Sequence, residues 1–260
     1  MSKTEYVYIL ILNYNNFLKT IDCINSIFKS KYKKYKIIII DNNSSDNSKN
    51  NLNKWIKINK YNSIQLIHNS RNGGYAYGNN KGIEIALKNE DCKYIWVLNN
   101  DALIDENTLL ELINYSDSSD MTIYGSKIIN YNDSKIESIG GIINKNNLKT
   151  SHNIYKNIDI DYIPGVSLFF NKDIVLKIGY FPEEYFMYYE DVDWCTKALK
   201  NNIKLMIAIN SLVYHNKNKS SKIKIRSLYN RIRYCIKYHP LKILNVLYGI
   251  IFKNYLITKK

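Results

Sequence analysis

The segment KIIIIDNNSSD, residues 36–46, contains the pattern on which the predicted fold of this 260-residue chain depends. Its run of isoleucines, within residues 36–40, is typical of a strand buried on both faces of a sheet. The strand ends at Asp41 in a polar segment, where Ser45 and Asp46 are suited to cap a following helix. A buried strand that leads through polar residues into a helix predicts one unit of an α/β fold.

The same order of strand and helix is repeated on both sides of this segment. Further strands are predicted at residues 6–12, 64–68 and 94–98, and helices at residues 17–29, 77–87 and 106–115. Strands that alternate with helices predict an α/β fold with a mostly parallel central sheet flanked by helices.

The second half of the chain is less regular. Strands are predicted around residues 122–130 and 161–170 and at 203–209 and 212–215, and helices at 171–178 and 190–199. An amphipathic helical tail follows, with Ile225, Leu228, Ile232, Cys235 and Ile236 on one face and Arg226, Arg233 and Lys237 on a neighbouring face. Pro240 is expected to kink or end this helix. We therefore divide the chain into a main domain, residues 1–220, and a tail, residues 221–260.

Polar residues follow each of the first four predicted strands. They are Asn13, the segment beginning at Asp41, a segment with glycines at positions 73, 74, 78 and 82, and the run NND at residues 99–101. Each one alone has a structural explanation, as a helix cap, an Asx-turn or a tight turn. Because ligands of open α/β sheets bind at the carboxyl ends of the strands, the four together predict a site for ribose, base and phosphate.

Two further features point to metal and proton chemistry, and a third is more typical of a structural role. Asp101, at the end of the fourth strand, can hold Mg²⁺ or Mn²⁺ against a pyrophosphate. The segment MYYEDVDW, residues 187–194, has three carboxylates within four residues, which indicates either a catalytic base near a cation or an acidic first helical turn. His215 ends a short apolar strand, and a lone histidine of this kind is more typical of a structural residue.

Taken together, these segments resemble the inverting glycosyltransferases of family 2, which have the nucleotide-binding GT-A fold. The resemblance is to the rhamnosyltransferase-like branch that builds bacterial surface polysaccharides, and it covers about residues 6–220. Its motifs are ILNYN (11–15), IIIIDNNSSDNS (37–48), NGGYAYGNNKGI (72–83), YIWVLNNDA (94–102), the segment 164–202 and VYHN (213–216). The first Asp of the family's metal-binding Asp-x-Asp is Asn99 here, so Asp101 is the only charged ligand from that motif.

The resemblance implies a role for each of these residues. Asp191 would be the catalytic base, with Glu190 and Asp193 as second choices. Asp101 and His215 would hold Mg²⁺ or Mn²⁺, and the nucleotide-sugar donor would be held by Asn13, Asp41, Asn72, Gly74 and Asn80. Residues 1–102 would form the donor-binding half and 103–220 the acceptor half of a catalytic domain. The donor would be linked to dTDP or UDP, with dTDP-rhamnose as one candidate, and the acceptor would be a saccharide or a lipid-linked saccharide.

The charge of the chain is unevenly distributed. The net charge is +14, and all of the excess lies after Asp193, because 15 Lys or Arg residues and no Asp or Glu follow it. Such a tail is expected to contact an anionic membrane surface through residues 222–260, to pack on the main domain, or only to aid solubility. The four cysteines lack metal-ligand spacing, and no signal peptide or membrane-spanning run is visible. We therefore expect a cytoplasmic protein, peripheral on the inner face of the cell membrane if the tail binds lipid.

Other classes of function compete with this interpretation. The basic tail and abundant tyrosines are also found in nucleic-acid-binding proteins, but the charge is confined to the tail and no RNA-binding signature is present. No nucleic-acid partner is therefore expected. A sugar-nucleotide nucleotidyltransferase usually has a glycine-rich basic loop after the first strand, whereas residues 13–17 are NYNNF. The presence of Asp101, Asp191 and His215 argues against an inactive scaffold.

Overall fold

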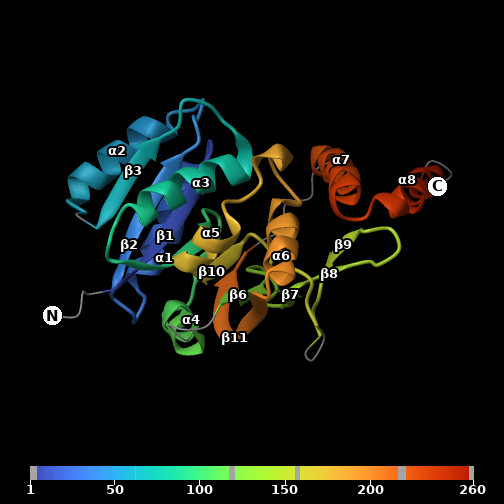
Figure 1. Ribbon diagram of the computed structural model, residues 1–260. Helices are drawn as coiled ribbons and strands as arrows, with labels where there is room; N and C mark the ends of the chain where they lie inside the picture. The colour runs from blue at the N-terminus through green and yellow to red at the C-terminus, as the bar shows by residue number, and fades with distance from the viewer. Residues whose placement is uncertain (1–4, 62, 117–120, 156–158, 216–220, 258–260) are drawn as a thin grey trace.

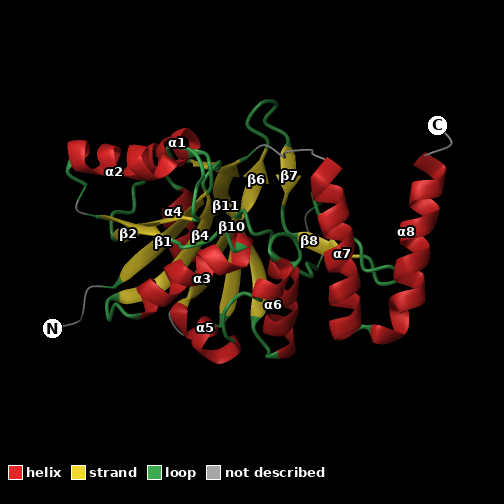
Figure 2. Ribbon diagram, turned by 90° about the horizontal axis from the view of Figure 1, so that it is seen from above, coloured by secondary structure: helices red, strands yellow, loops and turns green. Residues whose placement is uncertain are grey.

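The computed structural model describes residues 5–61, 63–116, 121–155, 159–215 and 221–257. Its main feature is a nine-stranded sheet with the strand order β3-β2-β1-β4-β10-β6-β11-β5, in which β7 pairs with β6 (Figures 1 and 2). The strands are β1 (Tyr6–Asn13), β2 (Tyr35–Asp41), β3 (Ile64–His68), β4 (Cys92–Asn99), β5 (Leu103–Ile104), β6 (Thr122–Ile129), β7 (Ile136–Ser138), β10 (Ser167–Asn171) and β11 (Lys204–Tyr214). A separate hairpin is formed by β8 (Gly141–Ile143) and β9 (Thr150–His152).

The first four predicted strands are confirmed, and they lie side by side in parallel. Their registers pair Asn13 with Asp41 and Asp41 with His68, so the polar residues that follow these strands meet at one edge of the sheet. Strand β10 enters antiparallel between β4 and β6, which makes the sheet mixed but mostly parallel. The edge where the polar residues meet is the carboxyl end of the parallel strands, at which α/β sheets bind ligands.

Helices cover both faces of the sheet. They are α1 (Phe17–Phe28), α2 (Ser48–Asn59), α3 (Gly74–Leu87), α4 (Thr108–Tyr115), α5 (Lys172–Ile178), α6 (Glu190–Lys200), α7 (Ser221–Tyr238) and α8 (Ile243–Ile257). Alternate residues of β1 enter two different cores, because successive side chains of a strand point to opposite faces. Val7 and Ile9 pack with residues of α1, α2 and α4, whereas Tyr8 and Leu10 pack with residues of α3, α5 and α6.

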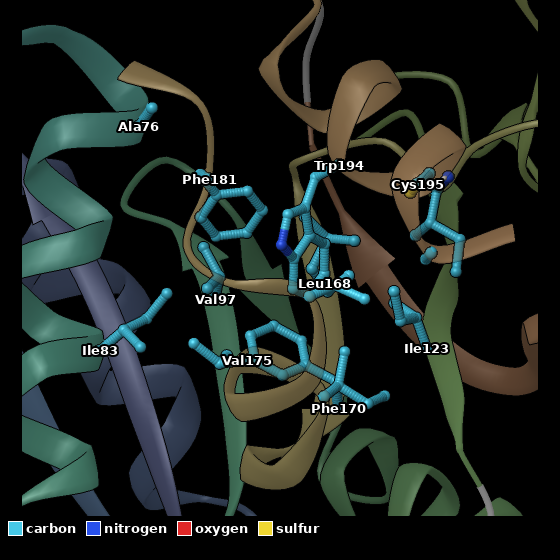
Figure 3. Close-up of a cluster of buried hydrophobic side chains, with 14 of the residues drawn as sticks. Ala76, Ile83, Val97, Ile123, Leu168, Phe170, Val175, Phe181, Trp194 and Cys195 are labelled. Carbon is cyan, nitrogen blue, oxygen red and sulfur yellow. Dashed lines mark hydrogen bonds between the residues drawn. The ribbon is translucent and has the colours of Figure 1, made fainter. Parts of the chain in front are cut away.

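Several aromatic side chains lie together in the second of these cores. The ring centroids of Phe181 and Phe170 lie 4.6 and 4.9 Å from the ring centroid of Trp194, a residue of α6 (Figure 3). The indole nitrogen of Trp194 donates to the Gly179 carbonyl over 2.9 Å, so this large side chain is buried without an unpaired polar atom. The packing fixes α6, and with it Asp191 in the first turn of that helix, against the sheet.

Several predicted boundaries are wrong. The two short strands expected at 203–209 and 212–215 are a single strand, β11, which continues across a register shift between Ala208 and Leu212. Helix α3 begins at Gly74 rather than residue 77, and α4 begins at Thr108 rather than residue 106. Strand β10 begins at Ser167 rather than near residue 161, and α2 has Asn47 at its N-cap rather than Ser45 or Asp46.

The tail consists of two helices that Pro240 separates, as predicted. Figure 2 shows α7 beside the main domain and α8 lying next to α7. The predicted apolar stripe is only partly packed, because Cys235 is buried but Ile225 is 73% exposed and Ile236 is 61% exposed. The buried face also carries Asn230 and Tyr234, which the stripe did not include. Among the described residues, no helix combines the length and the hydrophobicity that a membrane span requires.

Candidate functional site

Asp41 is fixed at the carboxyl end of β2 by neighbouring polar groups. The Asn13 amide donates to Asp41 Oδ1 over 2.9 Å and to the Ser44 hydroxyl over 3.1 Å, and the Ser44 hydroxyl donates to Asp41 Oδ1 over 2.6 Å. The Asn13 oxygen also accepts from the Thr20 hydroxyl, and the Asn13 side chain is completely buried. In this structure Asn13 therefore orients Asp41, and its predicted direct contact with the nucleotide stays a prediction.

The loop before α3 is held by Asn42, a residue that the sequence interpretation missed. Asn42 Nδ2 donates to Asn72 Oδ1 over 2.9 Å and to the Gly74 carbonyl over 3.0 Å. The Gly74 N–H also donates to Asn72 Oδ1, so the loop is closed at the N-terminus of α3. Gly74 has φ +88°, a conformation that favours glycine. These contacts place Asn72 and Gly74 beside Asp41, because Asn42 follows Asp41 directly.

Asn80 has a structural role that differs from its predicted one. Its amide nitrogen donates to the Phe181 carbonyl and to Glu183 Oε1, both over 2.9 Å, and its oxygen accepts from the Phe181 N–H. Both amide hydrogens are therefore used, and the side chain is buried. Asn80 therefore joins α3 to the segment before α6.

Asp101 and His215 lie together where β4 and β11 end. His215 Nε2 is 3.3 Å from Asp101 Oδ1, and the two side chains are 12% and 17% exposed, respectively. Burial alone would raise the pKa of Asp101, but the hydrogen bond and charge of His215, with a smaller effect of Lys19, lower it below its ordinary value. Asp101 is therefore an ionised carboxylate at neutral pH, with an imidazole beside it.

The pair is suited to a divalent cation that also binds phosphate. Across the parts of the chain that the structure describes, no cluster of three or more His, Cys, Asp or Glu side chains could hold a metal ion. A carboxylate and an imidazole are acceptable ligands for Mn²⁺, and Mg²⁺ is commonly held by one or two carboxylates together with substrate phosphates. The donor set thus fits a metal that is shared with a diphosphate.

Asp191 lies in the first turn of α6, half-buried, and backbone groups orient both of its oxygens. Asp191 Oδ2 accepts from the Gly165 N–H and Oδ1 accepts from the Val192 N–H, each over 2.9 Å. Burial raises the pKa of Asp191, although these N–H groups oppose the change. Burial, and then the charge of Asp191, raise the pKa of the neighbouring Glu190 well above its ordinary value. Glu190 is 5% exposed, and its Oε2 finds no hydrogen-bond partner within the described ranges.

Asp193 does not fit its place as a second choice for the base. Its carboxylate is 1% exposed and accepts from the hydroxyls of Tyr185 and Tyr238 over 2.7 and 2.8 Å. Lys237 Nζ lies 2.8 Å from Asp193 Oδ2. With these three partners, the buried Asp193 carboxylate connects α6 to α7.

A short backbone path connects Asp191 to Asp101. The Gly165 N–H donates to Asp191, and the carbonyl of the next residue, Val166, accepts from the Asn99 N–H over 3.0 Å. Asn99 ends β4 two residues before Asp101, and its neighbour in β1, Leu12, precedes Asn13. The structure therefore brings Asp41, Asp101 and Asp191 to the same edge of the sheet.

Comparison with known proteins places this chain in a family. The sequence model of "Glycosyl transferase family 2" matches residues 8–179. The chain is 27% identical over 207 residues to the low-salt glycan biosynthesis hexosyltransferase Agl10 of Haloferax volcanii, covering 76% of this chain and 62% of that protein. It is 26% identical over 205 residues to the dTDP-rhamnosyl transferase RfbF of Shigella flexneri, covering 77% and 66%. The chain thus spans less than two thirds of the length of either relative.

A solved structure shares the fold. The mannosyltransferase PcManGT from Pyrobaculum calidifontis, in complex with GDP-Man and Mn²⁺, superposes with a TM-score of 0.67 at 14% sequence identity. The match covers 95% of this chain and 69% of that one. At this identity the likeness concerns the fold alone, which is the GT-A fold.

Proposed function

The chain belongs to glycosyl transferase family 2, and from this premise we propose that it transfers a sugar from a nucleoside-diphosphate donor to a hydroxyl group. The observation that carries the proposal is the meeting of the Asp101–His215 pair and Asp191 at one edge of the sheet, joined through residues 165–166. We further propose a dTDP- or UDP-linked donor, with dTDP-rhamnose as the first candidate because of the relative RfbF. The acceptor would be a saccharide or lipid-linked saccharide in the synthesis of a surface polysaccharide.

Asp191 is the proposed general base. As the acceptor oxygen bonds to the anomeric carbon, its proton passes to Asp191, and the bond from that carbon to the diphosphate oxygen breaks on the opposite side. This single displacement inverts the anomeric centre. A carboxylate with a raised pKa is a stronger base than an ordinary aspartate, and a positioned base contributes about 10²–10⁴-fold.

Asp101 and His215 are the proposed ligands of Mg²⁺ or Mn²⁺. When bound, such an ion supplies Lewis-acid neutralisation of the departing diphosphate. Asp41 would hydrogen-bond the base or ribose of the donor. Asn72 and Gly74 would contact the donor from the start of the donor loop, residues 72–83. Asn13 supports Asp41 in this scheme, and Asn80 anchors the loop's helix.

A panel of donors tests the proposal. The purified chain is incubated with Mn²⁺, simple hydroxyl acceptors and UDP-, dTDP- or GDP-linked sugars, and the released nucleoside diphosphate is measured with and without acceptor. We expect one dTDP- or UDP-linked sugar to give acceptor-dependent release and a product of inverted anomeric configuration. If no donor in the panel releases nucleotide above the no-enzyme rate, or if the configuration is retained, the proposal is wrong.

We also propose that the tail contacts an anionic membrane surface. Leu241, Leu244 and Tyr248 are 98%, 75% and 61% exposed, and they lie among the basic residues of the tail. Substitution is a better test than truncation, because α7 carries buried contacts with the main domain. Leu241→Ser with Leu244→Ser should reduce sedimentation with anionic liposomes. The matched pair Leu18→Ser with Leu176→Ser, at exposed positions of the main domain, should not reduce it. Equal sedimentation of the two double variants would exclude Leu241 and Leu244 from a membrane contact.

A further inference from the structure

The segment that leads into α6 has an unfavourable backbone conformation. Phe186, Tyr188 and Tyr189 have φ values of 58°, 73° and 76°, a region that residues with a side chain rarely adopt. We call residues 185–189 the pre-helix loop. Because Asp191 follows this loop by two residues, the conformation of the loop sets the position of the proposed base. Such strain persists only where surrounding groups determine the backbone.

Asn230 of α7 supplies much of that support. Its amide nitrogen lies 2.9, 2.9 and 2.7 Å from the carbonyl oxygens of Tyr185, Met187 and Tyr188, and its side chain is buried. An amide nitrogen has two hydrogens, so one of them is shared between two carbonyls. One side chain from the tail thus binds three carbonyls of the pre-helix loop.

The Phe186 carbonyl connects the loop to the donor side. The Phe186 carbonyl accepts from the Tyr75 N–H at the start of α3, next to Gly74. On the tail side, the Arg226 guanidinium lies 4.2 Å from the centroid of the Phe186 ring. The pre-helix loop is therefore fixed between α7 on one side and the N-terminus of α3 on the other.

We propose that Asn230 is a positioning residue for sugar transfer, through which the tail helix α7 sets the placement of Asp191. The inference rests on the proposed function. It assigns the tail a role in the reaction itself, in addition to any contact with a membrane. The donor loop has a second support in Asn42, so the loss of Asn230 should affect the chemical step more than nucleotide binding.

The test compares two substitutions in α7. Asn230→Asp keeps the size of the side chain but removes the N–H donors and places a carboxylate against three carbonyls. Tyr234→Phe is the matched control, because it removes a buried 2.8 Å hydrogen bond from the same helix to Thr196 but keeps the ring that packs on Tyr189 of the loop. We expect Asn230→Asp to lower kcat about 10²-fold, the loss typical of a misplacement on the order of 1 Å. Nucleotide affinity by calorimetry should change by less than about threefold, and Tyr234→Phe should keep both values.

Amide hydrogen exchange of a peptide covering residues 183–193 provides a measurement that needs no substrate. It should become faster in Asn230→Asp than in Tyr234→Phe. Suppose that the wild type transfers sugar. The positioning role is then refuted, while the proposed function stands, if the kcat of Asn230→Asp is within about twofold of the wild-type kcat. It is also refuted if Tyr234→Phe loses as much kcat as Asn230→Asp. If the wild type uses no donor, the proposed function fails, and unchanged exchange in Asn230→Asp would separately refute the support of the loop. If Asn230→Asp does not fold, Asn230→Ser decides by the same criteria.

Discussion

Replacing Gly74 by alanine should impair transfer by displacing the pre-helix loop. A Cβ atom at this position would lie 2.0 Å from the Phe186 carbonyl oxygen and 2.6 Å from its carbon. The first contact falls about 1.4 Å short of an ordinary 3.4 Å separation, and both atoms belong to the backbone, which cannot turn aside as a side chain can. The loop must therefore recede by on the order of 1 Å, which is enough to cost about 10²-fold in rate when a catalytic group moves with it.

A matched substitution separates this displacement from backbone strain. Gly179 has φ +80°, close to the +88° of Gly74, but the nearest atom to its added Cβ would be Lys197 Nζ at 3.6 Å. Both alanine variants should lose about 1–3 kcal/mol of stability from the positive φ. Only Gly74→Ala should lose about 10²-fold in kcat, measured by nucleotide release at saturating donor. Near-normal turnover in Gly74→Ala, or an equal loss in Gly179→Ala, would refute the reasoning.

Three further predictions concern the ionisable groups. Asp101→Ala should weaken donor binding measured by calorimetry with Mn²⁺ but not without metal, and unchanged affinity with Mn²⁺ would remove its metal role. Glu190→Gln should raise the melting temperature at pH 8 but not at pH 4. The folded state holds the Glu190 proton more tightly than the unfolded state does, because the pKa of Glu190 is raised on folding. The wild type therefore loses stability as the pH rises above the ordinary glutamate pKa. A stability difference that is the same at both pH values would contradict this. The rate of transfer should rise with pH through the raised pKa of Asp191, and a pH–rate profile that stays flat down to the ordinary aspartate range would exclude Asp191 as the titrating base.

The sheet could be predicted from sequence because its central strands are unusually uniform. Runs such as the isoleucines of 37–40 are buried on both faces, and each ends in polar residues that the parallel register places at one edge. The antiparallel entry of β10 could not be predicted in the same way, because an apolar run does not specify strand direction. The continuity of β11 was missed because the residues at its register shift, between Ala208 and Leu212, interrupt the apolar pattern.

The candidate site was predicted by residue type but not by side-chain direction. Asn13 and Asn80 have the polar groups of a ligand contact, yet both point inward and use their amides to hold other residues. Asn230 lies in a basic helix far along the chain, and nothing in its surroundings in the sequence signals contact with residues 185–188. The apolar stripe of the tail was only partly right, with Cys235 buried but Ile225 and Ile236 exposed, because the tertiary contact of α7 also uses polar and aromatic side chains.

The central claim is that Asp191 acts as the base of a sugar transfer whose donor binds at the Asp41 and Asp101 edge of the sheet. The most direct test measures transfer and donor affinity on the same sample of Asp191→Asn, which retains the shape of the side chain. The account predicts a loss of about 10²–10⁴-fold in transfer, with donor affinity close to that of the wild type. Transfer by Asp191→Asn at a near-normal rate would contradict it.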